Sequence, residues 1–79
     1  MRIPSFHALP ADRQAAIQRS AVEIANTYGK DAALDILEHP DARRNWEHST
    51  VVLRMLQRDL KGEVNDATFG QAAEAIRAY

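Results

Sequence analysis

Apolar residues recur every three or four positions along most of this 79-residue chain. This spacing places them on one face of an α-helix, whereas the alternation of apolar and polar residues typical of a half-buried strand is missing. Alanine, the strongest helix former, is abundant. The sequence therefore predicts an all-α fold, in the form of a compact bundle of about four helices.

The length of the chain sets the number of domains and the means of stabilising them. Domains seldom have fewer than about 50 residues, so we expect residues 1–79 to form a single helical domain. The chain has no cysteine, which excludes disulfides and Cys-based zinc sites. A chain this short buries only about 60–65% of its unfolded surface, so it depends on good helix packing or on self-association.

Glycine and proline mark where the helices begin and end. Pro10 suits the first turn of a helix, and Gly29 and Gly62 are favoured just past a helix C-terminus. Pro40 ends another helix, because the residue before a proline avoids helical backbone angles. The predicted helices span about 10–28, 32–39, 41–61 and 66–78, and the third is the longest and central. Short loops between them favour antiparallel packing.

Residues at the ends of the predicted helices are expected to cap them or to pack over their first turns. Asp31 is suited to cap the second helix, and Asn65 or Asp66 the fourth. Phe6 and Leu9 precede the first helix, and we expect them to fold back over its first turn.

The third predicted helix carries two apolar surfaces. At 100° per residue, one stripe occupies an arc about 80° wide. The stripe consists of Ala42, Trp46, Ser49, Leu53, Leu56 and Leu60. We expect it to face the core, with Trp46 as a packing anchor. A second apolar strip lies outside this arc and consists of Val51, Val52 and Met55.

This second strip predicts a neighbour that the core of one bundle does not supply. A weak homodimer through the third helix, or a partner protein docked in its place, would cover it. Association costs about 4–15 kcal/mol of entropy, so three apolar side chains support at most a weak dimer. The competing interpretation is that Phe6, Leu9 and Ile36 of the same chain cover the strip and leave a monomer.

A basic face lies on the other side of the third helix and consists of Arg43, Arg54, Arg58 and Lys61. Charged residues opposite a core stripe are typical of any surface helix, so a solvated face is the first interpretation. An acidic protein partner is the second. Nucleic acid ranks below both, because the net charge is −1 and no aromatic residue interleaves the cations for base stacking.

A helix-turn-helix unit is a further hypothesis. Ala25 and Gly29 have the four-residue spacing found at the turn of that DNA-binding motif. However, Lys30 follows the glycine where the motif usually has an apolar residue, and Asp35 occupies a later core position. An ordinary glycine at the end of a helix explains the same residues.

No pattern for catalysis, cofactors or metal is found. The chain lacks a Gly-rich phosphate loop and a nucleophile elbow, so we do not expect an enzyme. Asp35 and His39 lie four positions apart, but no metal-binding motif surrounds them. No apolar stretch approaches the 18–20 residues or so of a membrane span, and we expect a cytoplasmic, unprocessed protein without membrane contact.

A small helical chain without a chemical site must act through its surface. We therefore expect a small regulatory or inhibitory module that binds another protein. The predicted contact residues lie on the third helix and are Arg43, Val51, Val52, Arg54, Met55, Arg58 and Lys61. The alternatives are a small DNA-binding regulator, acting through Ala25–Gly29 or the basic face, and a purely structural accessory subunit.

Overall fold

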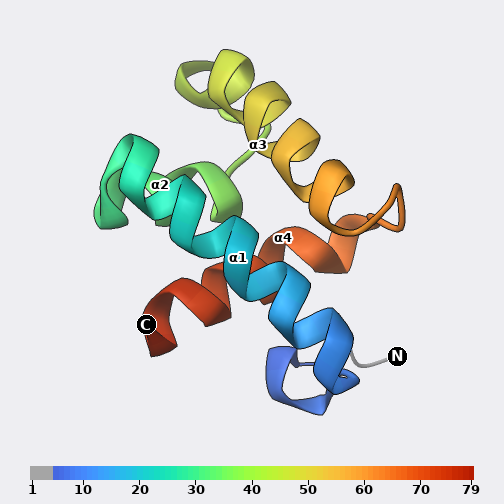
Figure 1. The fold of residues 1–79 in the computed structure, drawn as a ribbon. Helices are drawn as coiled ribbons and strands as arrows, with labels where there is room; N and C mark the ends of the chain where they lie inside the picture. The colour runs from blue at the N-terminus through green and yellow to red at the C-terminus, as the bar shows by residue number, and fades with distance from the viewer. Residues whose placement is uncertain (1–4) are drawn as a thin grey trace.

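The computed structural model describes residues 5–79, which form a bundle of four α-helices without a strand (Figure 1). The helices are α1 (Ala11–Tyr28), α2 (Lys30–Glu38), α3 (Trp46–Asp59) and α4 (Asp66–Ala78). Two short 3-10 helices, η1 (Phe6–Ala8) and η2 (Arg43–Asn45), precede α1 and α3. The predicted all-α fold is confirmed. Within this part of the chain, no helix is long and apolar enough to cross a membrane.

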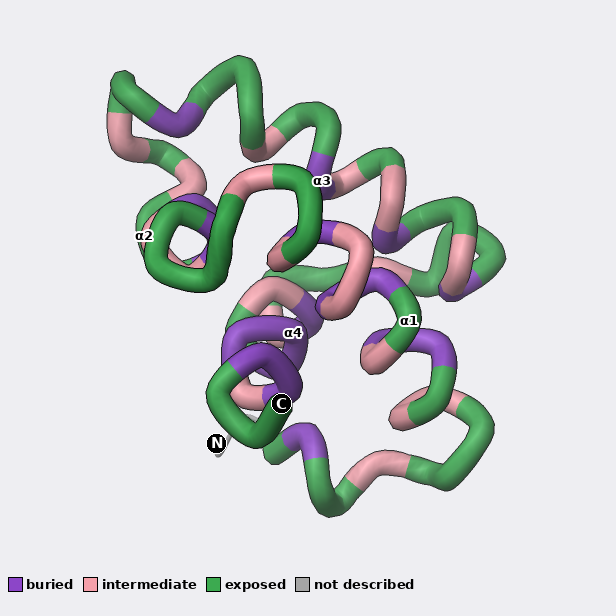
Figure 2. Tube along the Cα trace, turned by 60° about the vertical axis from the view of Figure 1, so that its left-hand side comes forward, coloured by how far each residue is buried: buried purple, intermediate pink, exposed green. Residues whose placement is uncertain are grey.

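Helix α1 organises the core, because it packs against α2, α3 and α4. Helix α4 packs against α1 and α2 but makes little direct contact with α3. Ile17, Ile24, Leu56 and Ile76 are fully buried where these helices meet. Figure 2 shows many buried positions on α4, whereas α3 is exposed along most of its length.

Helices α1 and α4 are the most extensively packed pair, and small side chains line the interface between them. Ala16 and Ala21 on α1 are buried together with Ala72 and Ala73 on α4. Alanine lets two helix axes approach more closely than larger side chains do. The close packing of these two helices follows directly from the alanine-rich sequence.

The segment before α1 folds back as predicted. The Leu9 carbonyl accepts a hydrogen bond of 2.8 Å from Nε2 of Gln14 in the first turns of α1. Phe6 is buried, and its backbone N–H donates to Glu74 Oε2 at 2.7 Å. Phe6 therefore also ties this segment to α4.

A single residue, Gly29, joins α1 to α2. Its φ of +88° and ψ of 153° lie in a region that is essentially restricted to glycine. Its N–H donates to the Ala25 carbonyl and its carbonyl accepts from the Ala33 N–H, both at 2.9 Å. Because α2 already begins at Lys30, Asp31 lies in the first turn, and the prediction that Asp31 caps this helix is wrong.

Asn65 caps α4 as the sequence indicated. Its Oδ1 accepts from the Ala67 N–H at 2.9 Å, and its own N–H donates to Thr68 Oγ1 at 3.1 Å. This reciprocal pair forms a capping box that satisfies free N–H groups at the helix start.

Helix α3 begins later than the predicted residue 41, because side chains ahead of it bond to α2. Arg44 pairs with the Asp35 carboxylate through two hydrogen bonds, of 2.9 and 2.8 Å. Nδ2 of Asn45 donates to Asp35 Oδ2 at 3.1 Å and to the His39 carbonyl at 2.9 Å. Ala42 has an extended backbone. Residues 40–45 are therefore an ordered connection and not the first turn of a long helix. Helix α3 has 14 residues and α1 has 18, and α1 is the helix that contacts the other three. The prediction that the third helix is the longest and central is therefore wrong.

The buried face of α3 also differs from the predicted one. Val52 and Leu56 are fully buried, but Trp46 is 59% exposed. Relative to the predicted stripe, the buried face is rotated about the helix axis by about 40°. The prediction that Trp46 anchors the core is wrong. The reason is that α3 packs mainly against α1, while α4 leaves the Trp46 side of α3 uncovered.

The second apolar strip is largely internal. Val52 belongs to the core, Met55 is half-buried against it, and Val51 is 40% exposed. Helix α1 covers this side of α3, as shown by Tyr28, whose ring lies edge-on to His48 at 5.0 Å between centroids. The structure therefore explains most of the strip within one chain, through α1, whereas η1 (Phe6–Ala8) packs against α4.

Candidate protein-binding groove

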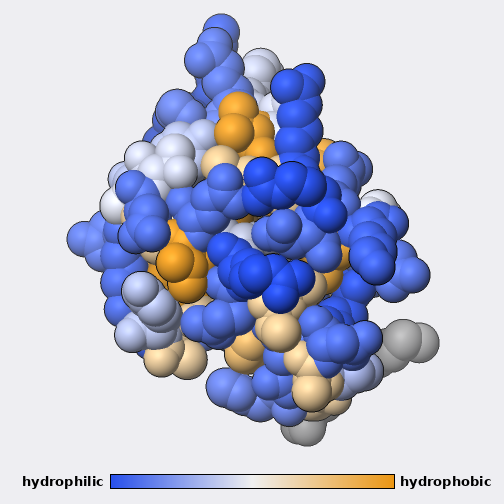
Figure 3. All heavy atoms as spheres, in the orientation of Figure 1, coloured by the Kyte–Doolittle hydropathy of each residue, from blue (hydrophilic) through white to orange (hydrophobic). Residues whose placement is uncertain are grey.

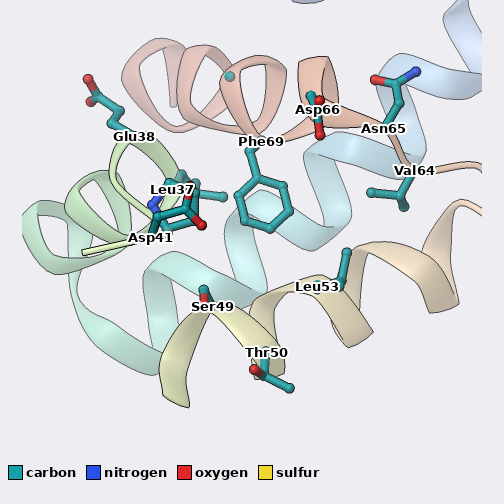
Figure 4. Close-up of a pocket in the computed structure, with 12 residues that line it drawn as sticks. Leu37, Glu38, Asp41, Ser49, Thr50, Leu53, Val64, Asn65, Asp66 and Phe69 are labelled. Atoms are coloured by element: carbon teal, nitrogen blue, oxygen red, sulfur yellow. The ribbon is translucent and has the colours of Figure 1, made fainter. Parts of the chain in front are cut away.

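An open groove of about 810 Å³ lies between the end of α2, the first half of α3 and the start of α4 (Figure 4). It exists because α3 and α4 make little contact with each other. Its lining residues are Leu37, Glu38, Pro40, Asp41, Ser49, Thr50, Leu53, Val64, Asn65, Asp66, Phe69 and Gly70.

The floor of the groove is apolar. Leu37 is buried, Val64 and Phe69 are half-buried and pack against the core, and Leu53 is half-buried. In Figure 4 the Phe69 ring projects from α4 into the middle of the groove, and Leu53 faces it from α3. The floor therefore offers hydrophobic surface to an occupant that lies between these two helices.

The rim of the groove is acidic. Glu38, Asp41 and Asp66 are among the lining residues, and the described residues contribute no lysine, arginine or histidine to the lining. Glu38 pairs with Arg77, whereas Asp41 and Asp66 are exposed and form no ion pair within residues 5–79. The open mouth thus carries two carboxylates that no cation within residues 5–79 pairs with.

Trp46 lies beside one end of the groove. Its indole Nε1 donates a hydrogen bond of 2.9 Å to the backbone carbonyl of Asp41, a lining residue. At 100° per residue, Trp46 shares one face of α3 with the lining residues Thr50 and Leu53. The largest exposed apolar side chain of the described chain is therefore adjacent to the groove.

The contact residues predicted from the sequence are not brought together at this site. Val51, Arg54, Met55 and Arg58 lie on the side of α3 turned away from the groove. Val52 is inside the core.

The predicted basic face is not one helical stripe. Arg43 belongs to η2 and Lys61 follows the end of α3 at a φ of +54°. Arg58 pairs with Glu23 and, at 3.3 Å, with Asp59. Arg54 is the one cation of the four that lies on α3 and forms no ion pair within residues 5–79. The cations are therefore dispersed or neutralised.

The remaining polar clusters hold helices together. Hydrogen bonds from Arg44 and Asn45 hold the pKa of Asp35 well below its usual range. The Asp35 carboxylate, which was considered with His39 as a metal ligand, is therefore already engaged by two side chains. No group of three His, Asp or Glu residues suited to a metal occurs in the described part of the chain.

A hydrogen bond between a buried serine and a half-buried aspartate links α1 to α3. Ser20 is fully buried, and its Oγ donates to Asp59 Oδ2 at 2.6 Å. Burial raises the pKa of Asp59, but the hydrogen bonds from Ser20 and Arg58 outweigh it, so the net shift is downward. The Ser20 hydroxyl is committed to a carboxylate inside the protein and serves packing.

The residues of the groove were not predicted as a site, because Leu37, Leu53 and Phe69 each look like core residues within their own helix. One feature of the sequence could have indicated the site, namely the acidic residues near predicted helix ends, Glu38, Asp41 and Asp66. No protein-family model matches the chain, and no curated protein or solved structure matches it significantly.

Proposed function

We propose that this chain is a small protein-binding module that docks a segment of another protein in the groove beside Trp46. The observation that carries this proposal is the 59% exposure of Trp46 next to an open groove with an apolar floor. Exposed apolar surface rimmed by polar residues marks interaction sites, and tryptophan is enriched among the residues that dominate binding energy.

The shape of the groove supports a macromolecular occupant. Small-molecule sites usually bury most of the ligand surface, whereas this groove is open to solvent along one side. The face of the molecule across which α1 runs differs from the groove, because Figure 3 shows that face as largely hydrophilic with small scattered apolar patches. The groove is thus the better candidate for a docking surface.

A regulatory or inhibitory role fits this mode of binding. A module that occupies a segment of its partner controls what else that segment contacts, and it needs no chemistry of its own. The sequence-based expectation of a regulatory module is retained, but its contact residues move from the outer side of α3 to the groove.

Position-specific photo-crosslinking in the native cell tests this proposal. A photoreactive residue at Thr50, which lines the groove, is compared with one at Asn26, an exposed position on α1. We expect a discrete protein adduct from position 50 that survives nuclease treatment. We expect the adduct to be lost when Gly70→Arg fills the groove and kept with Gly70→Ala. Equal adducts from both positions, or none from position 50, would contradict the proposal.

The homodimer through α3 receives less support. With Val52 in the core, Val51 and part of Met55 are the apolar surface left on that side. Stable interfaces bury about 800 Å² on each partner. Sedimentation of wild type and Val51→Glu tests the dimer, because that substitution leaves the core intact.

The DNA-binding alternative also receives less support. A helix-turn-helix has a turn of about three or four residues between its helices, whereas Gly29 alone separates α1 from α2. An adduct that disappears with nuclease in the crosslinking experiment would revive this alternative. A purely structural subunit would give an adduct that Gly70→Arg does not change.

A further inference from the structure

We propose that the occupant of the groove is an amphipathic helix whose apolar face is flanked by lysine or arginine residues. This inference rests on the proposed function and specifies the chemistry of the partner. The observations behind it are the acidic rim, the helical walls and the exposed indole of Trp46.

The charge of the rim selects a basic occupant. Asp41, from the connection before α3, and Asp66, from the start of α4, lie on different sides of the groove in Figure 4. Neither is neutralised by an ion pair within residues 5–79. Cations on both edges of an incoming apolar strip would therefore meet carboxylates. Such rim contacts act mainly on specificity and on the rate of association.

The walls of the groove select a helix over an extended chain. One way of binding an extended peptide adds a strand to a sheet edge, and the described part of the chain has no strand. Another docks a proline-rich peptide in a groove lined by aromatic residues, whereas the described lining of this groove has one aromatic residue, Phe69. An amphipathic helix brings its own backbone hydrogen bonds and presents apolar residues at positions i, i+3, i+4 and i+7. Lying between Leu53 on α3 and Phe69 on α4, it would act as an additional helix of the bundle.

Trp46 makes occupancy measurable. It is the single tryptophan of the chain and stands beside the end of the groove. An occupant that covers the indole moves it from water to an apolar environment, which shifts its fluorescence emission to shorter wavelength. Binding of a peptide without tryptophan can therefore be followed on the unmodified protein.

The probes are three short peptides without tryptophan. One is an amphipathic leucine–lysine helix, the second replaces each lysine by glutamate, and the third scrambles the first so that its apolar face is lost. We expect the leucine–lysine helix to bind in the micromolar range with a blue shift of Trp46. We expect the other two peptides to bind at least about tenfold more weakly, and the first to weaken as salt is raised.

Two pairs of variants locate the binding. Gly70→Arg places a long cationic side chain at the groove, and Gly70→Ala is its control. An added Cβ at Gly70 meets no atom within 4 Å, and both substitutions favour the helix. Asp41→Lys reverses a rim charge, and Asp31→Lys makes the same change at the other end of α2, outside the groove. We expect Gly70→Arg to abolish binding and Asp41→Lys to weaken it several-fold. Asp31→Lys should bind like wild type, and Gly70→Ala, which adds only a methyl group at the groove, should bind far more tightly than Gly70→Arg.

Three results would overturn the inference. They are equal binding of the lysine and glutamate helices, binding that Gly70→Arg and Asp41→Lys leave unchanged, and no binding of the leucine–lysine helix. If crosslinking from position 50 still captures a protein in any of these cases, the proposed function stands and the occupant has another chemistry. If crosslinking fails while the peptide binds, the groove recognises basic helices but the proposed cellular role is wrong.

Discussion

The indole N–H of Trp46 donates to the backbone carbonyl of Asp41 across 2.9 Å, although most of the Trp46 side chain lies in water. The bond joins the first residue of α3 to the connection that precedes it. It satisfies the polar atom of the indole and orients the ring without burying it. A side chain that is already oriented loses less conformational entropy on binding.

The exposure of Trp46 leads to a prediction about stability. We expect Trp46→Ala to lower the free energy of unfolding by less than about 1 kcal/mol, because little more than one hydrogen bond and partial packing are lost. Leu56→Ala, at a fully buried position of the same helix, should cost about 2–5 kcal/mol. Urea unfolding followed by circular dichroism measures both. Equal losses for the two variants would place Trp46 in the core.

The backbone of Gly29 leads to a second prediction. No atom lies within 4 Å of a Cβ added at Gly29, but its φ of +88° disfavours any side chain. We expect Gly29→Ala to destabilise the protein by about 1–3 kcal/mol. Gly70→Ala, in the middle of α4 and equally free of close contacts, should instead stabilise it by up to about 1 kcal/mol. Thermal unfolding compares the pair. Unchanged stability in Gly29→Ala would contradict the conformational argument, and a loss in Gly70→Ala would contradict the free space at that position.

The low pKa of Asp35 leads to a third prediction. Because hydrogen bonds from Arg44 and Asn45 lower the pKa in the folded state, the ionised carboxylate stabilises the fold above its unfolded pKa of about 3.9. This contribution is lost as the pH falls below that value. We expect wild type to be more stable than Asp35→Asn at neutral pH and the two to converge in acid. A difference that stays constant with pH would contradict this role of Asp35.

The sequence predicted the four helices well, because periodicity, glycine and proline are local signals. The ends of α1 and α4 lie within a residue of the predicted positions. The start of α3 was missed, because the hydrogen bonds from Arg44 and Asn45 to α2 join residues that helix periodicity does not relate.

The groove was not predictable, because it depends on which neighbour covers which side of α3. Trp46 and Val52 both lie at the edges of apolar arcs, and the sequence alone does not decide which edge is buried. The structure buries Val52 against α1 and exposes Trp46 where α4 diverges. A site that arises between helices distant in sequence leaves no local motif.

An amide NMR map of the protein titrated with the leucine–lysine helix tests binding in the groove most directly. We expect the largest shifts on the Trp46 indole N–H and on the backbone amides of Leu37, Leu53 and Phe69, while Val51 and Arg54 change little. Shifts centred on Val51 and Arg54 would contradict this expectation, because the outer side of α3 and not the groove would then be the binding surface.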